Sequence, residues 1–402
     1  MTHAKPKAKP TKAQAAKATA SKATKTKATS AKTTRAGADA PEPTLGDLVE
    51  KRRIMICSGS GGVGKTTVAA VLGIEAAKRG RRVVVVTIDP AKRLADALGL
   101  DGIGNQPTRI AGDWDGELSA VMLDTKTTFD DLVTRYAAES EQAERILANR
   151  FYKNISGALS GTQEYMAMEK LYDLQADEAF DLVVVDTPPS RNALDFLDAP
   201  RRLTRFLDHR LYRVLMAPTR GVMRAVNVAA QAFVRSVSKV VGGEVFDDAI
   251  AFFQAFDGME EGFRERAEHV LELLSSPATS FVLVASPRRD TVDEARFFAE
   301  KLGEASIPVA ALVVNRMHPH FTDALPEALR ERAHTLDGTD LGDHYRNLAD
   351  FALVAGREEE HLEGLAEQVA PAPMVRVPIL RSDVHDLTGL AEVGDHLFGR
   401  VS

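Results

Sequence analysis

Residues 59–66 form a glycine-rich segment whose pattern is typical of a phosphate-binding loop. The segment fits G-x-x-x-x-G-K-[ST], in which backbone N–H groups point at phosphate oxygens and the lysine reaches the β- and γ-phosphates. It follows an apolar run at residues 54–57 and precedes a helical pattern at residues 66–79, which is the context that such a loop requires. We therefore predict an ATP site. Its loop residues are Gly59, Ser60, Gly61, Gly62, Val63, Gly64, Lys65, Thr66 and Thr67.

Two aspartates stand at the ends of apolar runs and could complete this site. Asp186 ends the run at residues 182–185, and Asp89 ends the run at residues 83–88. Ligands of open α/β sheets bind beyond the carboxyl ends of the strands, so both carboxylates can converge on the loop. Asp186 suits an acid that holds Mg²⁺ through water, beside the Thr66 hydroxyl, and Asp89 suits a residue that orients the attacking water. Taken alone, each aspartate also fits an ordinary strand-end turn.

The elements that must position these residues are predicted from seven short apolar runs. Several of the runs are continuous and rich in valine, which is typical of strands buried on both faces of a sheet. Helical patterns fill the gaps, so the fold class is α/β with a doubly wound, mostly parallel sheet. The runs are residues 54–57, 83–88, 118–123, 182–185, 281–284, 309–314 and 375–379.

One stretch, residues 192–277, lacks a convincing strand and predicts an inserted helical subdomain. The nucleotide domain would then comprise residues 48–191 and 278–402. Eight of the 17 Phe residues lie in the insertion, and two interpretations of this remain open. Phenylalanines such as Phe252 and Phe256 either line an apolar groove for a client helix or pack the core of the subdomain itself. The helical patterns within the insertion are residues 203–216, 222–241, 245–256 and 263–274.

Charge is distributed unevenly along the chain. The net charge is −6, but residues 1–38 carry ten Lys and Arg residues and no acid, so the rest of the chain carries −16. Residues 1–47 cannot bury enough apolar surface to fold, and we predict a disordered tail. The tail is either a solubilising extension or makes weak, salt-sensitive contact with nucleic acid or anionic lipid.

The apolar runs and the cysteine count exclude several classes of protein. No apolar stretch follows the basic tail as in a signal peptide, and no run reaches the roughly 20 residues of a membrane span. We expect a cytoplasmic protein, with a peripheral position at the inner face of the membrane as an alternative. Cys57 is the single cysteine, which rules out intramolecular disulfides and multi-cysteine metal sites.

Together these motifs resemble the arsenical-pump and tail-anchored-protein-targeting ATPase family, over about residues 52–400. The loop through Thr67 matches the family's deviant phosphate loop. The Asp-Pro-Ala motif at residues 89–91 is similar to its first switch, and the Asp-Thr-Pro-Pro-Ser motif at residues 186–190 is similar to its second. Asn315 resembles the strand-end asparagine that reads adenine, and Pro378 belongs to a segment similar to the one that packs against the base. The resemblance implies ATP and Mg²⁺ as cofactors, a dimer, and client-binding helices in the insertion.

The chain also departs from the family pattern. The family's signature lysine, which crosses the dimer to the partner's phosphates, is replaced by Ser60. Because a neutral serine cannot supply that charge, we hypothesise a heterodimer with a paralogue that carries the lysine. The alternative is that Lys92, Arg93 or Arg191 supplies the charge. Arg191 and Asn192 stand where the second switch of the family usually has Gly-His.

The single cysteine bears on the family's metal sites. Zinc needs about four ligands, and members that clamp their dimer with zinc use a Cys-x-x-Cys pair, so we expect no zinc here. Thiolate capture of arsenite is excluded for the same reason.

The function expected from these features is a Mg²⁺-dependent ATPase that couples nucleotide state to dimer conformation and to a hydrophobic client or membrane partner. One alternative is a partition or positioning ATPase whose basic tail binds DNA or membrane. Deletion of residues 1–43 would then abolish DNA binding. A second alternative is a low-turnover regulatory subunit of a heterodimer, which single-turnover hydrolysis with and without the partner would distinguish from an enzyme.

Overall fold

The computed structural model describes residues 43–89, 93–155, 162–188, 198–199, 201–202, 204–205, 208 and 243–400. Predictions for the basic tail up to residue 42, for residues 90–91 of the first switch motif and for residues 189–190 of the second therefore lie outside the described residues. The same holds for the helical pattern at residues 222–241 and for nearly all of that at residues 203–216. Within the predicted tail of residues 1–47, Thr44 instead caps a helix that begins at the buried Leu45.

The centre of the fold is a sheet with the strand order β3-β4-β2-β5-β1-β6-β7-β8. All neighbouring strands are parallel except β3 and β4, which are antiparallel. All seven predicted strands are confirmed. Strand β3 is an additional strand of three residues at the edge. The strands are β1 (Ile54–Ser58), β2 (Arg82–Thr87), β3 (Thr108–Ile110), β4 (Glu117–Met122), β5 (Leu182–Asp186), β6 (Thr279–Ala285), β7 (Val309–Met317) and β8 (Met374–Pro378).

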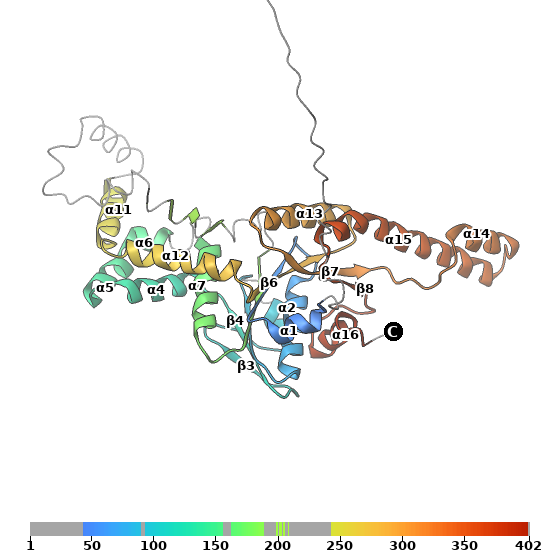
Figure 1. The fold of residues 1–402 in the computed structure, drawn as a ribbon, viewed down its shortest axis with the longest axis horizontal. Coiled ribbons are helices and arrows are strands. Elements are labelled where there is room, and N and C mark those ends of the chain that lie inside the picture. The colour runs from blue at the N-terminus through green and yellow to red at the C-terminus, as the bar shows by residue number, and fades with distance from the viewer. Residues whose placement is uncertain are drawn as a thin grey trace, which may run out of the picture. The chain divides into compact units, whose positions relative to one another are not determined.

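Helices cover both faces of the sheet and give it two hydrophobic cores (Figure 1). On one face, α1 (Leu45–Lys51), α2 (Lys65–Lys78), α3 (Arg93–Ala97) and α16 (Leu387–Leu397) pack against alternate side chains of the strands. On the other face lie α7 (Thr162–Ala176), α12 (Glu260–Ser275) and α13 (Arg289–Glu304). Because side chains of the central strands alternate between these two cores, the strands require apolar residues at every position, which explains the unbroken valine runs.

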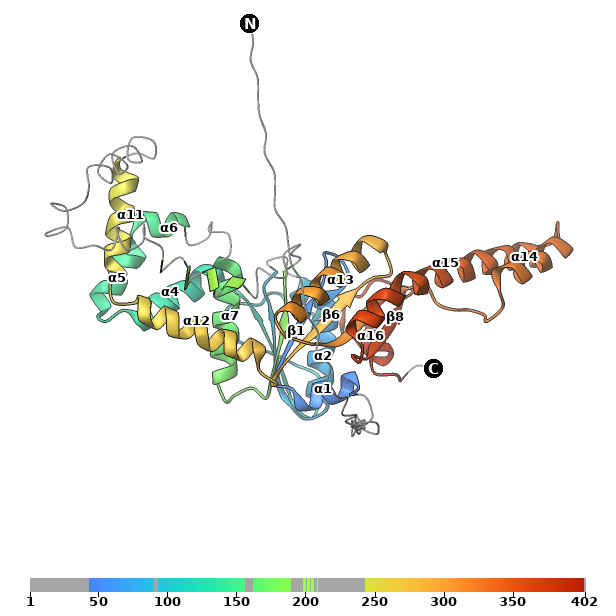
Figure 2. The ribbon, with the colours of Figure 1, turned by 45° about the horizontal axis from the view of Figure 1, so that its top comes forward.

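A helical layer extends the second core beyond the sheet. Helices α5 (Ser140–Ala148) and α6 (Arg150–Ile155) lie beside α11 (Gly243–Ala255), although about 100 residues separate them in the chain (Figures 1 and 2). Helix α4 (Thr125–Tyr136) packs against α5 and links this layer to α7. The described part of the predicted insertion therefore packs against helices that the sequence assigned to the nucleotide domain. Helices α11 and α12 confirm the predicted helical patterns at residues 245–256 and 263–274.

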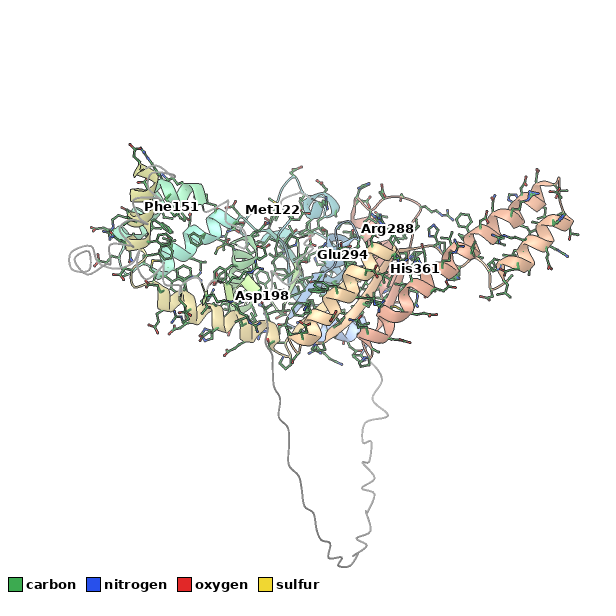
Figure 3. All side chains as sticks on the ribbon, turned by 90° about the horizontal axis from the view of Figure 1, so that it is seen from above. Met122, Phe151, Asp198, Arg288, Glu294 and His361 are labelled. Atoms are coloured by element: carbon green, nitrogen blue, oxygen red, sulfur yellow. The ribbon has the colours of Figure 1, made fainter. Side chains whose placement is uncertain are left out.

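Aromatic side chains fill the interior of this layer. Phe252 and Phe256 are only 5% and 8% exposed, and their ring centroids are 5.0 Å apart. Phe252 stacks on Tyr152 of α6. Its ring centroid lies 5.7 Å from that of Phe151, which is labelled in Figure 3. Of the two interpretations for these phenylalanines, the packing supports the one in which they form part of the subdomain's own core.

The remaining helices form a hairpin after β7. The hairpin consists of α14 (Pro326–Thr335) and the 30-residue helix α15 (Asp340–Val369), which are joined by a short turn and seen at the orange-red end of Figure 2. Among the described helices, none combines the length and the apolar character that crossing a membrane requires.

Candidate nucleotide site

The phosphate loop lies at the carboxyl end of β1 and leads into α2. Gly64 precedes α2 with a φ of 97°, a left-handed conformation that favours glycine. A Cβ atom at Gly64 would lie 2.3 Å from Nδ2 of Asn315, and a Cβ atom at Gly59 would lie 2.0 Å from the carbonyl oxygen of Val284. Both glycines are therefore required because β6 and β7 approach the loop closely.

Lys65 is the first residue of α2 and lies folded back across the loop. Its side chain is largely buried, and Nζ donates a hydrogen bond to the carbonyl oxygen of Ser60 at 2.9 Å. Burial lowers the pKa of Lys65, while the carboxylates of Asp186 and Asp89 oppose that shift. The ammonium group thus sits in a partly desolvated position, where its attraction to a phosphate is stronger than in water.

The parallel register brings Asp186 beside the loop. Asp186 at the end of β5 is paired with Cys57 of β1 and with Thr87 of β2. Its Oδ2 accepts hydrogen bonds from Oγ1 of Thr66 at 2.7 Å and from Oγ1 of Thr87 at 2.9 Å. Its Oδ1 is buried without a hydrogen-bond partner. The structure therefore joins two of the predicted metal-binding residues, Thr66 and Asp186, in one cluster.

The donor set of this cluster fits Mg²⁺. Mg²⁺ binds oxygen ligands and retains several waters, so one hydroxyl and one carboxylate are enough protein ligands beside a nucleotide. The unpartnered Oδ1 of Asp186 is a buried acceptor that a hydrated cation would satisfy. In the described part of the chain, no group of three or more His, Cys, Asp or Glu side chains is placed to hold a metal ion. The expectation that zinc is not bound remains a prediction.

Burial of Asp186 predicts that the free energy of unfolding of the nucleotide-free protein depends on pH. Burial raises its pKa from 3.8 to about 6, against the opposing hydrogen bonds from Thr66 and Thr87. A raised pKa means that its contribution to stability is complete below about pH 4 and is lost as the pH rises through about 6. We expect Asp186→Asn to raise the free energy of unfolding by up to about 3 kcal/mol at pH 8, and by about half as much near pH 5. Urea unfolding at both pH values measures the difference.

Asp181→Asn is the matched control for this experiment. Hydrogen bonds from Arg82 lower the pKa of Asp181, so this variant should lose stability at pH 8. Equal effects of Asp186→Asn at the two pH values would show that ionisation of Asp186 does not limit stability.

Asp89 follows β2 at the predicted position of the first switch. Its backbone N–H donates to Oγ1 of Thr87 at 3.2 Å, and its carboxylate lies 3.5 Å from the guanidinium of Arg93. Nε2 of Gln163, near the start of α7, donates to the carbonyl oxygen of Ile88 at 2.9 Å. Helix α7 therefore contacts the chain one residue before Asp89.

A pocket of about 490 Å³ lies over the loop. It brings together Lys65, Thr66 and Asp89 from the predicted site, and it adds residues that the sequence analysis did not assign to the site. The lining residues are Gly62, Gly64, Lys65, Thr66, Thr67, Asp89, Arg93, Asp96, Ala97, Thr187, Arg316, Val384 and His385.

Neither of the two predicted base-binding residues lines this pocket. Nδ2 of Asn315 donates to the carbonyl oxygen of Val63 at 2.9 Å, so Asn315 holds the loop. Pro378 ends β8 and is paired with Met317 of β7. Adenine recognition by these two residues remains a prediction. Among the pocket-lining residues that were not predicted from the sequence, Arg316 could have been found from one signal. It directly follows Asn315 at the end of a predicted strand.

Ser60, at the predicted position of the missing lysine, is buried in the loop. Its Oγ has no hydrogen-bond partner, and its carbonyl oxygen accepts the bond from Lys65. In this conformation the Ser60 side chain brings no charge to the pocket.

Comparisons with known proteins found a matching family model and several relatives. A family model described as "Anion-transporting ATPase" matches residues 52–339. The protein named ATPase GET3 of Malassezia globosa is 32% identical over 171 residues, which are 42% of this chain and 49% of that protein. ATPase ASNA1 homolog 1 of Paramecium tetraurelia is 31% identical over 171 residues, 42% of this chain and 50% of that protein. The chain thus spans about half the length of these two relatives. ATPase GET3 of Phaeosphaeria nodorum is 23% identical over 280 residues, 69% of this chain and 80% of that protein.

Proposed function

Because the chain belongs to the anion-transporting ATPase family, we propose that it binds ATP with Mg²⁺ and hydrolyses it at the pocket over residues 59–66. The observation that carries this proposal is the cluster of Lys65, Thr66 and Asp186, with a buried carboxylate oxygen that has no partner. The names of the three relatives, all called ATPases, support the same activity.

The residues of the pocket have distinct roles in this proposal. Lys65 leaves the carbonyl oxygen of Ser60 and donates to the phosphates, together with the N–H groups of the loop. Thr66, and Asp186 through water, would hold Mg²⁺, which would supply positive charge to neutralise the phosphate oxygens. Asp89 accepts a hydrogen bond from water and orients it toward the γ-phosphate. Catalysis consists of positioning and electrostatic stabilisation, with no covalent intermediate.

Replacement of Lys65 tests this proposal. We expect Lys65→Ala to weaken binding of Mg·ATP by about 100-fold or more, because it removes a desolvated cation aimed at the phosphates. Lys51→Ala is the control, since Lys51 is an exposed lysine of α1 that pairs with Asp47. Titration of a fluorescent ATP analogue measures both dissociation constants. Equal affinity in Lys65→Ala and the wild-type protein would contradict the proposed site.

We also propose that the active form is a heterodimer with a paralogue that carries lysine at the position of Ser60. The buried, uncharged side chain of Ser60 supports this, because residue 60 would bring no cation to either site of a homodimer, whereas the paralogue's lysine would bring one to the site of this chain. A regulatory subunit with little turnover of its own is the second candidate function, and the same observation favours it.

We further propose that nucleotide state is coupled to the helical layer, which takes a hydrophobic client helix or a membrane partner in the cytoplasm. Helix α7 supports the coupling because it contacts both regions. At its start, Gln163 bonds to the carbonyl oxygen of Ile88. Nearer its end, Asp173 accepts hydrogen bonds from the guanidinium of Arg135 on α4 at 2.8 and 3.1 Å. A movement of the chain next to Asp89 would therefore be transmitted to α4 through α7.

A further inference from the structure

Arg316 occupies an unusual backbone position at the end of β7. The register between β7 and β8 shifts between Asn315 and Met317, so Arg316 is the extra residue of a β-bulge. Its φ is 64°, in the left-handed region that non-glycine residues rarely adopt. Such backbone strain persists where the surrounding structure holds it and is found frequently at ligand sites. Bulges beside active sites commonly redirect a side chain.

The bulge directs Arg316 over the phosphate loop. Its guanidinium NH1 donates to the carbonyl oxygen of Gly62 at 3.2 Å, and the residue lines the pocket together with Lys65 and Arg93. Its backbone N–H donates to Oδ1 of Asn315 at 2.9 Å. The strained residue and the loop are thus fixed relative to each other by Asn315, which itself bonds to Val63.

The charges in the pocket leave Arg316 available for an anion. Arg93 pairs with Asp89, and Lys65 lies near the carboxylate of Asp186. Arg316 makes no ion pair with any described carboxylate, and its bond to Gly62 uses one of its five N–H groups. A guanidinium that has N–H donors to spare and no ion pair with a described carboxylate is suited to bidentate binding of phosphate oxygens.

We propose that Arg316 is a further nucleotide-binding residue, whose guanidinium contacts the phosphate groups of the bound nucleotide. The assignment rests on the proposed function and adds a cation that no sequence motif indicates. A purely structural role, in which Arg316 only braces the loop through Gly62, predicts different behaviour. If the residue served structure alone, glycine would suit the left-handed position better but would remove the brace.

The test compares Arg316→Gly and Arg316→Lys with Arg357→Ala, a control at an exposed arginine of α15 that does not line the pocket. We expect Arg316→Gly to weaken Mg·ATP binding by about tenfold, as for loss of a charge-assisted hydrogen bond, and Arg316→Lys to weaken it less. Inorganic tripolyphosphate, which lacks base and ribose, should lose affinity by the same factor in competition with a fluorescent ATP analogue. The thermal midpoint of nucleotide-free Arg316→Gly should equal or exceed that of the wild-type protein, because the backbone strain is relieved. Arg357→Ala should change neither the affinity for the two probes nor the thermal midpoint.

Three results would overturn the assignment. A lower thermal midpoint with unchanged nucleotide affinity would show that Arg316 only braces the loop. Weaker binding of ATP with unchanged binding of tripolyphosphate would move the contact away from the phosphates. Unchanged affinity for both probes in Arg316→Gly, when the wild-type protein binds them, would refute the contact and leave the proposed function standing. Absence of ATP binding by the wild-type protein would instead refute the proposed function.

Discussion

ATP hydrolysis is expected to rise by about 10³-fold or more when a paralogue with lysine at the position of Ser60 is added to the purified chain. Cations that enter a phosphate site from a partner stabilise the charge of the transition state and have effects of this size in phosphoryl transfer. Ser60 has a neutral side chain buried in the loop, so residue 60 supplies no such cation when two copies of this chain pair. Steady-state phosphate release by the chain alone, by the paralogue alone and by the mixture measures the effect.

Substitutions at Ser60 provide the controls for this prediction. Ser60→Lys should raise hydrolysis by the chain alone, whereas Ser60→Ala should leave it unchanged, because Oγ of Ser60 has no hydrogen-bond partner. Comparable hydrolysis by the chain alone and in the mixture would refute the heterodimer hypothesis. If Arg93→Ala then abolished hydrolysis by the chain alone, Arg93 would be the cation that replaces the lysine.

Simultaneous substitution of Phe252 and Phe256 by serine is expected to unfold the helical layer. Both rings are buried in an aromatic cluster with Phe129, Tyr152 and Phe263. Truncation of a buried phenylalanine commonly costs about 3–5 kcal/mol, and serine adds an unsatisfied hydroxyl. Because the same core continues to the sheet, we expect a lower urea midpoint for the whole chain, measured by circular dichroism.

Exposed phenylalanines provide the matched comparison. Phe297 and Phe351 are each about half exposed, so Phe297→Ser and Phe351→Ser should change the free energy of unfolding by about 0.5 kcal/mol or less. An unchanged urea midpoint in the Phe252 and Phe256 double variant would contradict the packing. It would also favour the interpretation in which these residues line a client groove.

The sheet could be predicted from the sequence because its signals are local. The central strands β1, β2, β5 and β6 are buried along almost their whole length and therefore appear as unbroken apolar runs, as in Val83–Val86 within β2. The three-residue strand Thr108–Ile110 offers no such run and pairs only at the sheet edge. It could not be distinguished from a loop.

The residues of the candidate site also differ in whether local signals or pairing between distant parts of the chain place them. Lys65, Thr66, Asp89 and Asp186 lie at strand ends or at the start of a helix, so their meeting follows from parallel strand order alone. The role of Arg316 depends on a bulge created by pairing with β8, whose residues come about 60 positions later in the chain. The packing of Phe252 likewise depends on Tyr152, 100 positions earlier. Helical periodicity predicts a buried face but does not identify what covers it.

Calorimetric titration of ATP into the purified wild-type chain, with and without Mg²⁺, tests the central claim most directly. We predict saturable binding of one nucleotide per chain in the presence of Mg²⁺, because Lys65 and the loop bind the phosphates and the Thr66–Asp186 pair holds the metal. Without Mg²⁺, the affinity should fall. Absence of saturable binding, or binding that neither requires Mg²⁺ nor depends on Lys65, would contradict the account.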